Sequence, residues 1–159
     1  MMGKFNGKLV AEFTPPKTWV LEKQLSFESE ELNDADVAIL SQCGASVVDT
    51  GKGTGKVSCG KGMKTDLASV PRAIWAFISP WDVARAAVIH DHLYAKLRHF
   101  WWHGGGKGDK KTWKRARYLS DRVFLDGMKS AEPEVSSWKI YASYYAVRMF
   151  GRWPASAKE

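Results

Sequence analysis

The periodicity of the sequence changes near Ala73, from strand-like to helical, and this change limits the fold more than any other feature. Before it, short stretches of β-forming or alternating residues are separated by turn signals, at residues 7–13, 17–29 and 45–59. Strands followed by helices are typical of an α+β fold. We therefore predict one α+β domain over residues 1–159, with a β-rich part (1–64), a motif loop (65–81) and a helical part (82–151).

The helical part is expected to contain three helices. The first spans 82–100, with Asp82 in its first turn, where a negative charge suits the positive helix end. A glycine-rich connection leads to the second helix, at 111–130. Pro133 suits the first turn of a third helix that runs to Phe150, and Gly151 follows it at the position of a C-terminal cap. We expect the first two helices to pack antiparallel.

Composition excludes several classes of protein. A hydrophobic content of 45% is too high for a disordered chain. Two cysteines, Cys43 and Cys59, allow at most one disulfide, so we expect a reducing compartment rather than a disulfide-built secreted scaffold. The N-terminus lacks the apolar run of a signal peptide, and no apolar stretch is long enough for a transmembrane helix.

Four residues of the first two helices carry the candidate chemistry. His90 and Tyr94 share a face of the first helix, Asp91 is one step round, and Asp121 interrupts an apolar stripe of the second helix. A buried carboxylate needs a partner. If His90 is that partner, Asp121 would orient the imidazole as a general base. If Arg117, one turn before Asp121, is the partner, the pair is structural and His90 is a core residue.

The motifs resemble an uncharacterised family of phage and prophage proteins. They are the run TDLASVPR at 65–72, His90-Asp91-x-Leu93-Tyr94, Arg117-x-x-x-Asp121-x-x-Phe124 and Val147-Arg148-x-x-Gly151. The resemblance covers roughly residues 55–151. It implies a phage or prophage origin, with the virion or the cytoplasm of the infected host cell as the location. It implies no activity.

The pattern His-Asp-x-x-Tyr on one helix and Asp-x-x-Phe on the next is similar to the core of phospholipase A2. The resemblance implies that His90 activates water, that Asp91 binds calcium, and that Tyr94 and Asp121 orient His90. Calcium would then polarise the ester carbonyl. Phospholipases of this kind usually supply calcium ligands from a glycine-rich loop, which is missing between Pro71 and His90. Backbone carbonyls at 78–81, or the side chains of Asp66 and Ser69, would have to replace it.

A strongly basic window follows the first helix. Residues 96–122 contain nine bases and two acids, a balance equal to the net charge of +7 of the whole chain. Such a window faces an anionic partner or is a solvated surface. With the phospholipase resemblance, phospholipid is the expected partner, bound by the interfacial residues Trp101, Trp102, Lys96, Arg98, Lys110 and Lys111. Nucleic acid is the alternative, although no nucleic-acid-binding motif accompanies the window.

Other interpretations remain open at this point. In the motif loop, Asp66 and Ser69 could be ligands or donors at the site, or Asp66 and Arg72 could pin a turn. The histidines lack the spacing of a zinc site. Aromatic residues of the third helix (Trp138, Tyr141, Tyr144 and Tyr145) would pack in the core or form an interface.

Our leading hypothesis is a calcium-dependent ester hydrolase acting on phospholipid, and its rival is a non-enzymatic virion or assembly protein. The first requires His90 within hydrogen-bonding reach of Asp121 and Tyr94, with an open cleft at its other nitrogen. A His90 sealed in the core, with Asp121 turned to Arg117, favours the second.

Overall fold

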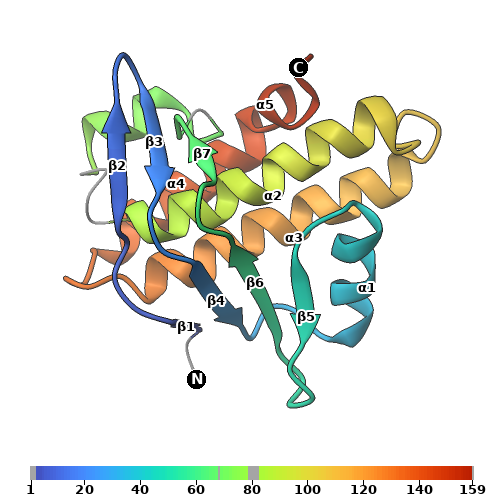
Figure 1. The fold of residues 1–159 in the computed structure, drawn as a ribbon, viewed down its shortest axis with the longest axis horizontal. Helices are drawn as coiled ribbons and strands as arrows, with labels where there is room; N and C mark the ends of the chain where they lie inside the picture. The colour runs from blue at the N-terminus through green and yellow to red at the C-terminus, as the bar shows by residue number, and fades with distance from the viewer. Residues whose placement is uncertain (1–2, 68, 79–82, 159) are drawn as a thin grey trace.

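The computed structural model describes residues 3–67, 69–78 and 83–158, and the predicted α+β class is confirmed (Figure 1). Within these ranges, seven strands form two antiparallel sheets. The four-stranded sheet has the order β1 (Lys4–Phe5), β4 (Leu25–Ser29), β6 (Gly55–Cys59), β5 (Val47–Asp49). The three-stranded sheet has the order β2 (Ala11–Thr14), β3 (Thr18–Leu21), β7 (Lys64–Thr65).

The N-terminal part also contains a helix that was not predicted from the sequence, α1 (Asp34–Gln42). Its start is fixed by a capping box, in which the Asn33 side chain accepts from the Asp36 backbone N–H at 2.9 Å and the Asp36 carboxylate accepts from the Asn33 N–H. The helix packs against β5 and α3. Residues 3–64 therefore contain one helix besides their strands.

Two long helices form the centre of the molecule: α2 (Ala84–His103) and α3 (Lys110–Lys129). They run antiparallel, as predicted, with strands of both sheets in front of them in Figure 1. Small residues allow their close approach, because a Cβ atom on Gly127 would lie 2.9 Å from Cβ of Ala86. The predicted helix start at Asp82 lies outside the described residues, and α2 ends three residues later than expected.

The C-terminal part differs from the prediction in its bounds. The third helix, α4 (Ser137–Phe150), begins after Pro133, which follows a cis peptide bond in the loop from α3. Gly151 caps α4 as predicted, donating its N–H to Val147 O at 2.8 Å. A short helix that was not predicted, α5 (Arg152–Ser156), follows at once and packs against α2. A 3-10 helix, η1 (Arg72–Ala76), lies in the motif loop.

The main core lies between the four-stranded sheet and the α2–α3 pair. Phe27 and Val57 of the sheet are fully buried, as are Phe124 and Met128 of α3. Burial of this apolar surface is the main force that holds the sheet on the helices. Among the described residues, no helix is both long and apolar enough to cross a membrane.

Candidate functional site

His90 and Asp121 meet between α2 and α3, in the part of the core where both side chains are fully buried. His90 Nε2 lies 2.8 Å from Asp121 Oδ1, and the Tyr94 hydroxyl donates to the same oxygen at 2.6 Å. The predicted placement of Tyr94 one turn after His90 is what brings its hydroxyl to this carboxylate. The contact expected from the phospholipase resemblance is therefore present in the structure.

The other oxygen of Asp121 is held by arginines. Arg148 Nη1 donates to Asp121 Oδ2 at 2.7 Å, and Arg117 Nη1 lies 3.6 Å from the same atom. Arg117 also donates to the carbonyl oxygens of Val147 (3.2 Å) and Arg148 (3.1 Å), near the end of α4. Asp121 thus contacts His90 and Arg117 at once, so both partners considered from the sequence lie beside it, and the contacts alone do not choose between the catalytic and the structural interpretation.

These contacts decide the ionisation of the site. Burial by itself raises the pKa of the Asp121 carboxyl, but the hydrogen bond and charge of His90, with the hydrogen bonds of Tyr94 and Arg148, outweigh it and lower the pKa. Burial, followed by the negative charge of Asp121, raises the pKa of the Tyr94 hydroxyl well above its ordinary value. Asp121 is therefore a carboxylate and Tyr94 a neutral donor at physiological pH.

An ionised Asp121 fixes the tautomer of His90. A carboxylate can only accept hydrogen bonds, so the ring nitrogen that contacts Asp121, Nε2, must carry a proton. In a neutral imidazole, Nδ1 then carries a free lone pair. Ser69 Oγ lies 3.1 Å from Nδ1 and is itself fully buried. When the imidazole is neutral, the Ser69 hydroxyl donates to Nδ1 and the Nε2–H group donates to the carboxylate. Such a chain can draw a proton from a hydroxyl at Nδ1.

Asp91, the predicted calcium ligand, points away from this chain. It is 5% exposed, and its Oδ2 accepts from the Thr65 hydroxyl at 2.5 Å. The same hydroxyl oxygen accepts from the Leu67 N–H at 3.1 Å, where the backbone turns through a positive φ of 59°. Asp91 therefore holds the start of the motif loop against α2.

The residues around Asp91 do not fit a calcium site. Calcium takes six to eight oxygen ligands, several of them usually carboxylates. Across the described ranges, no group of three or more His, Cys, Asp or Glu side chains could hold a metal ion. Of the backbone carbonyls expected to replace the missing loop, those of residues 79–81 lie outside the described residues. The calcium site stays a prediction from sequence.

Asp66 and Arg72, the other two predicted residues of the motif loop, are exposed. Asp66 Oδ2 is 3.7 Å from Lys17 Nζ. Arg72 lies at the start of η1. Of the three predicted motif-loop residues, only Ser69 reaches the candidate catalytic chain.

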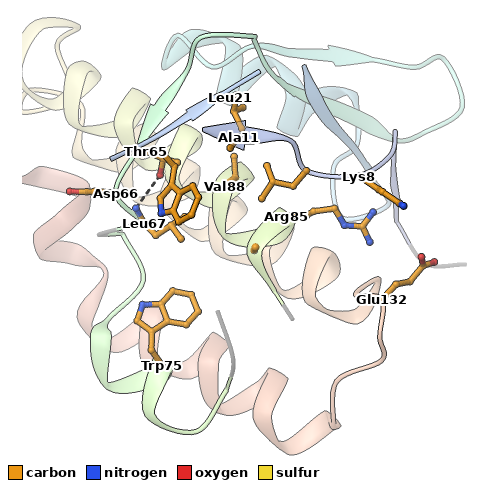
Figure 2. A pocket seen from close by; sticks show the side chains of 13 residues that line it. Lys8, Ala11, Leu21, Thr65, Asp66, Leu67, Trp75, Arg85, Val88 and Glu132 are labelled. Carbon is orange, nitrogen blue, oxygen red and sulfur yellow. Dashed lines mark hydrogen bonds between the residues drawn. The ribbon is translucent and has the colours of Figure 1, made fainter. Parts of the chain in front are cut away.

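A pocket of about 660 Å³ opens beside this loop (Figure 2). Most of its lining is apolar: Leu9, Ala11, Trp19, Leu21, Leu67, Trp75, Ala84 and Val88. Figure 2 shows Lys8, Arg85 and Glu132 on the opposite side from Leu67 and Trp75. Thr65, which holds Asp91, also lines it. His90 and Ser69 do not line this pocket, so the open cleft expected at Nδ1 is not found among the described residues.

The residues expected to form an interfacial surface are largely engaged within the chain. Trp101 is half-buried, with its ring 4.9 Å from that of Trp113. Trp102 Nε1 donates to the Ala157 carbonyl at 3.0 Å, and Arg98 Nη1 donates to the Pro154 carbonyl at 3.2 Å. These contacts fasten the C-terminal segment to α2. Lys96 is half-buried, whereas Lys110 and Lys111 are exposed at the start of α3.

Sequence reasoning placed Ser69 at the site without naming His90 as its neighbour, and it missed two partners: Thr65 as the donor to Asp91 and Arg148 as the donor to Asp121. All three lie in the motifs quoted from the sequence. The available signal was that polar motif residues far apart in the chain needed buried partners.

The chain belongs to the family described as Protein of unknown function (DUF1353), whose model matches residues 44–147, more than half of the chain. The match includes Thr65, Ser69, His90 and Asp121, and it ends one residue before Arg148. Comparisons with curated proteins and with solved structures gave no significant match.

Proposed function

We propose that the protein is an ester hydrolase of phage or prophage origin, similar in its catalytic core to phospholipase A2. One observation carries the proposal, the buried chain Ser69–His90–Asp121, with 3.1 Å between Ser69 Oγ and His90 Nδ1 and 2.8 Å between His90 Nε2 and Asp121 Oδ1. With a neutral imidazole, this chain combines an unprotonated ring nitrogen with a carboxylate that fixes the ring. We place the activity in the virion or in the infected host cell.

His90 would act as the general base. Its Nδ1 takes the proton of the attacking water as the water oxygen bonds to the ester carbonyl carbon, and Nδ1–H then returns the proton to the alkoxide that leaves. Asp121 stabilises the imidazolium formed between these steps, and Tyr94 and Arg148 keep Asp121 in place. In this mechanism, the attacking water takes the place beside Nδ1 that the Ser69 hydroxyl now occupies. Because Ser69 and His90 are buried, the motif loop must move before a substrate reaches Nδ1.

Phospholipid is the proposed substrate class. The pocket has an apolar lining suited to an acyl chain, with the cations Lys8 and Arg85 and the acid Glu132 at one side, where a charged head group would lie. Thr65, which lines the pocket, donates a hydrogen bond to Asp91, and Asp91 follows His90 in the sequence. The mechanism above takes no step through calcium, because the residues around Asp91 do not fit that ion.

The test is fatty-acid release from mixed phospholipid micelles, with calcium or with EDTA. His90→Gln is expected to lower the rate about 100-fold or more, since removing a general base typically costs that much. His92→Gln is the matched control, because His92 is a buried histidine of the same helix outside the Ser69–His90–Asp121 chain. Circular dichroism must show that both variants are folded. No release by the folded wild-type protein, over a panel of head groups, would end the proposal.

A second candidate function is a non-enzymatic virion or assembly protein. The observation in its favour is the complete burial of Ser69, His90 and Asp121, which is also what a structural polar cluster shows. Mass spectrometry of purified virions tests it. Presence at the copy number of a structural protein, without hydrolysis, supports this candidate, and absence from the particle opposes a virion role.

A further inference from the structure

Helix α4 is apolar on two opposite faces. Ile140, Tyr144 and Val147 point inward and are buried. The outer side carries six large apolar side chains that continue into α5: Trp138 (62% exposed), Tyr141 (40%), Tyr145 (60%), Met149 (68%), Phe150 (48%) and Trp153 (66%). We call these six residues the aromatic face. A surface helix normally turns polar residues outward, and a contiguous exposed apolar patch marks an interaction site.

The aromatic face is a straight, convex stripe. Trp138, Tyr141, Tyr145 and Met149 are spaced by three or four residues, so they follow one side of a helix about 21 Å long. The stripe is stiffened at both ends, because Trp138 stacks on Phe77 with ring centroids 6.1 Å apart and Phe150 stacks on Trp153 at 6.3 Å. A convex, linear stripe fits a plane better than a groove or a pocket.

The charge around the stripe is positive. Residues 135–158 contain the bases Lys139, Arg152 and Lys158 and no acid, besides Arg148, whose charge is paired with Asp121; Glu134 and Glu159 flank the segment. Lys129 of α3 places its ammonium 5.3 Å from the Tyr141 ring, and Lys139 lies 5.7 Å from the Trp138 ring. Two copies of this face would bring like charges together, so the face is complementary to an anionic partner rather than to itself.

We propose that the aromatic face docks the protein on an anionic phospholipid bilayer, with α4 lying in the plane of the surface. Trp and Tyr side chains insert at the depth of the head groups, while the flanking Lys and Arg side chains pair with phosphates. A single-stranded nucleic acid would also attract cations and aromatic rings, but it is usually bound in a groove. Docking requires no catalysis, and so it goes beyond the hydrolase proposal.

The experiment is co-sedimentation of the full chain with vesicles of phosphatidylcholine alone or with about 30 mol% phosphatidylglycerol, near the anionic content that gives a strong surface potential. The test variant is the triple substitution Tyr145→Ser, Met149→Ser and Trp153→Ser. All three side chains are at least 60% exposed, so the fold is expected to survive. The matched control is Phe13→Ser with Val48→Ser, two exposed apolar residues on the sheets.

We expect the wild-type and control proteins to bind the anionic vesicles, and we expect salt to weaken this binding. The affinity of the triple variant for the same vesicles should be lower by about tenfold or more. Absence of wild-type binding, or equal binding of the triple variant, would overturn the proposal. A triple variant that loses binding to a single-stranded oligonucleotide but keeps vesicle binding would overturn it in favour of nucleic acid. Loss of a dimer in sedimentation velocity, with vesicle binding unchanged, would assign the face to a second copy. His90→Gln should bind vesicles like wild type, which separates this test from that of hydrolysis.

Discussion

Arg148 donates to Asp121 Oδ2 at 2.7 Å, and this bond ties the end of α4 to the buried carboxylate between α2 and α3. The opposite oxygen of Asp121 bonds His90 and Tyr94. One carboxylate therefore joins the candidate base to the helix that carries the aromatic face. A substitution at Asp121 should disturb both the core and α4.

The first expectation concerns Asp121→Asn. An amide would turn its NH₂ group toward one set of donors and would leave Arg148 without a counter-charge. Breaking a buried ion pair from one side typically costs about 3–5 kcal/mol of unfolding free energy. Urea denaturation at neutral pH measures the loss. The control is Glu31→Gln, which removes a half-exposed pair with Arg122 (3.0 Å) and should cost about 1 kcal/mol or less. Equal losses in both variants would show that Asp121 is not a central stabilising residue.

The second expectation is a pH dependence set by His92. Burial first, and then the charge of Lys96, lowers the pKa of His92 to about 4. The unfolded chain, with an ordinary pKa near 6.5, therefore binds more protons than the folded chain between these values. The contribution of neutral His92 to the free energy of unfolding is therefore fully present above about pH 6.5. It decreases as the pH falls toward 4, by on the order of 3 kcal/mol in all.

His92→Gln should remove that dependence, because the glutamine does not titrate and can still accept from the Ser46 N–H, which lies 3.4 Å from His92 Nε2. The measurement is the difference in unfolding free energy between wild type and variant at several pH values from about 4.5 to 7.5. A difference that stays constant over this range would contradict the assignment. His99→Gln, at an exposed position of the same helix, is the control.

A third expectation tests the space around the Tyr94 hydroxyl. A Cβ atom on Gly151 would clash with both Tyr94 Oη and the Val147 carbonyl oxygen. Gly151→Ala should therefore push α4 away from α2, at a cost of about 1–3 kcal/mol, as for other overpacked sites. Gly60→Ala is the control, because a Cβ atom added there would meet nothing within 4 Å and its φ is not in the left-handed region. The measurement is the thermal unfolding midpoint of both variants. An unchanged midpoint for Gly151→Ala would show that the end of α4 can shift to accommodate the added methyl group without loss of stability.

Much of the fold followed from local patterns, and the exceptions have physical causes. The long helices were predicted because their apolar periodicity extends over several turns. Helix α1 was missed although Asn33 and Asp36 form a capping box, because nine residues give little periodicity to read. Helix α5 is shorter still, and its five residues follow the Gly151 cap without a break.

The site was predictable only within its helices. The helix faces left His90 and Arg117 as alternative partners of Asp121, and the resemblance to phospholipase A2 favoured His90, which does contact Asp121. Ser69 reaches His90 through the path of an irregular loop, and Arg148 reaches Asp121 through the packing of α4 on α3. Helical spacing carries no information about either path, so these partners required the structure.

The last expectation concerns the two thiols, which are free and buried. Burial first, and then the charge of Asp91, raises the pKa of Cys59 to about 12, and burial followed by the charge of Asp109 does the same for Cys43. The thiolate is the reactive form, so the folded protein should react with a disulfide reagent at about pH 8 only slowly. In denaturant both thiols should react rapidly with the reagent. Cys59→Ser and Cys43→Ser, each leaving one thiol, identify which group reacts. Rapid labelling of Cys59 in the folded protein would show that β6 opens without global unfolding, since its side chain is fully buried beside α2.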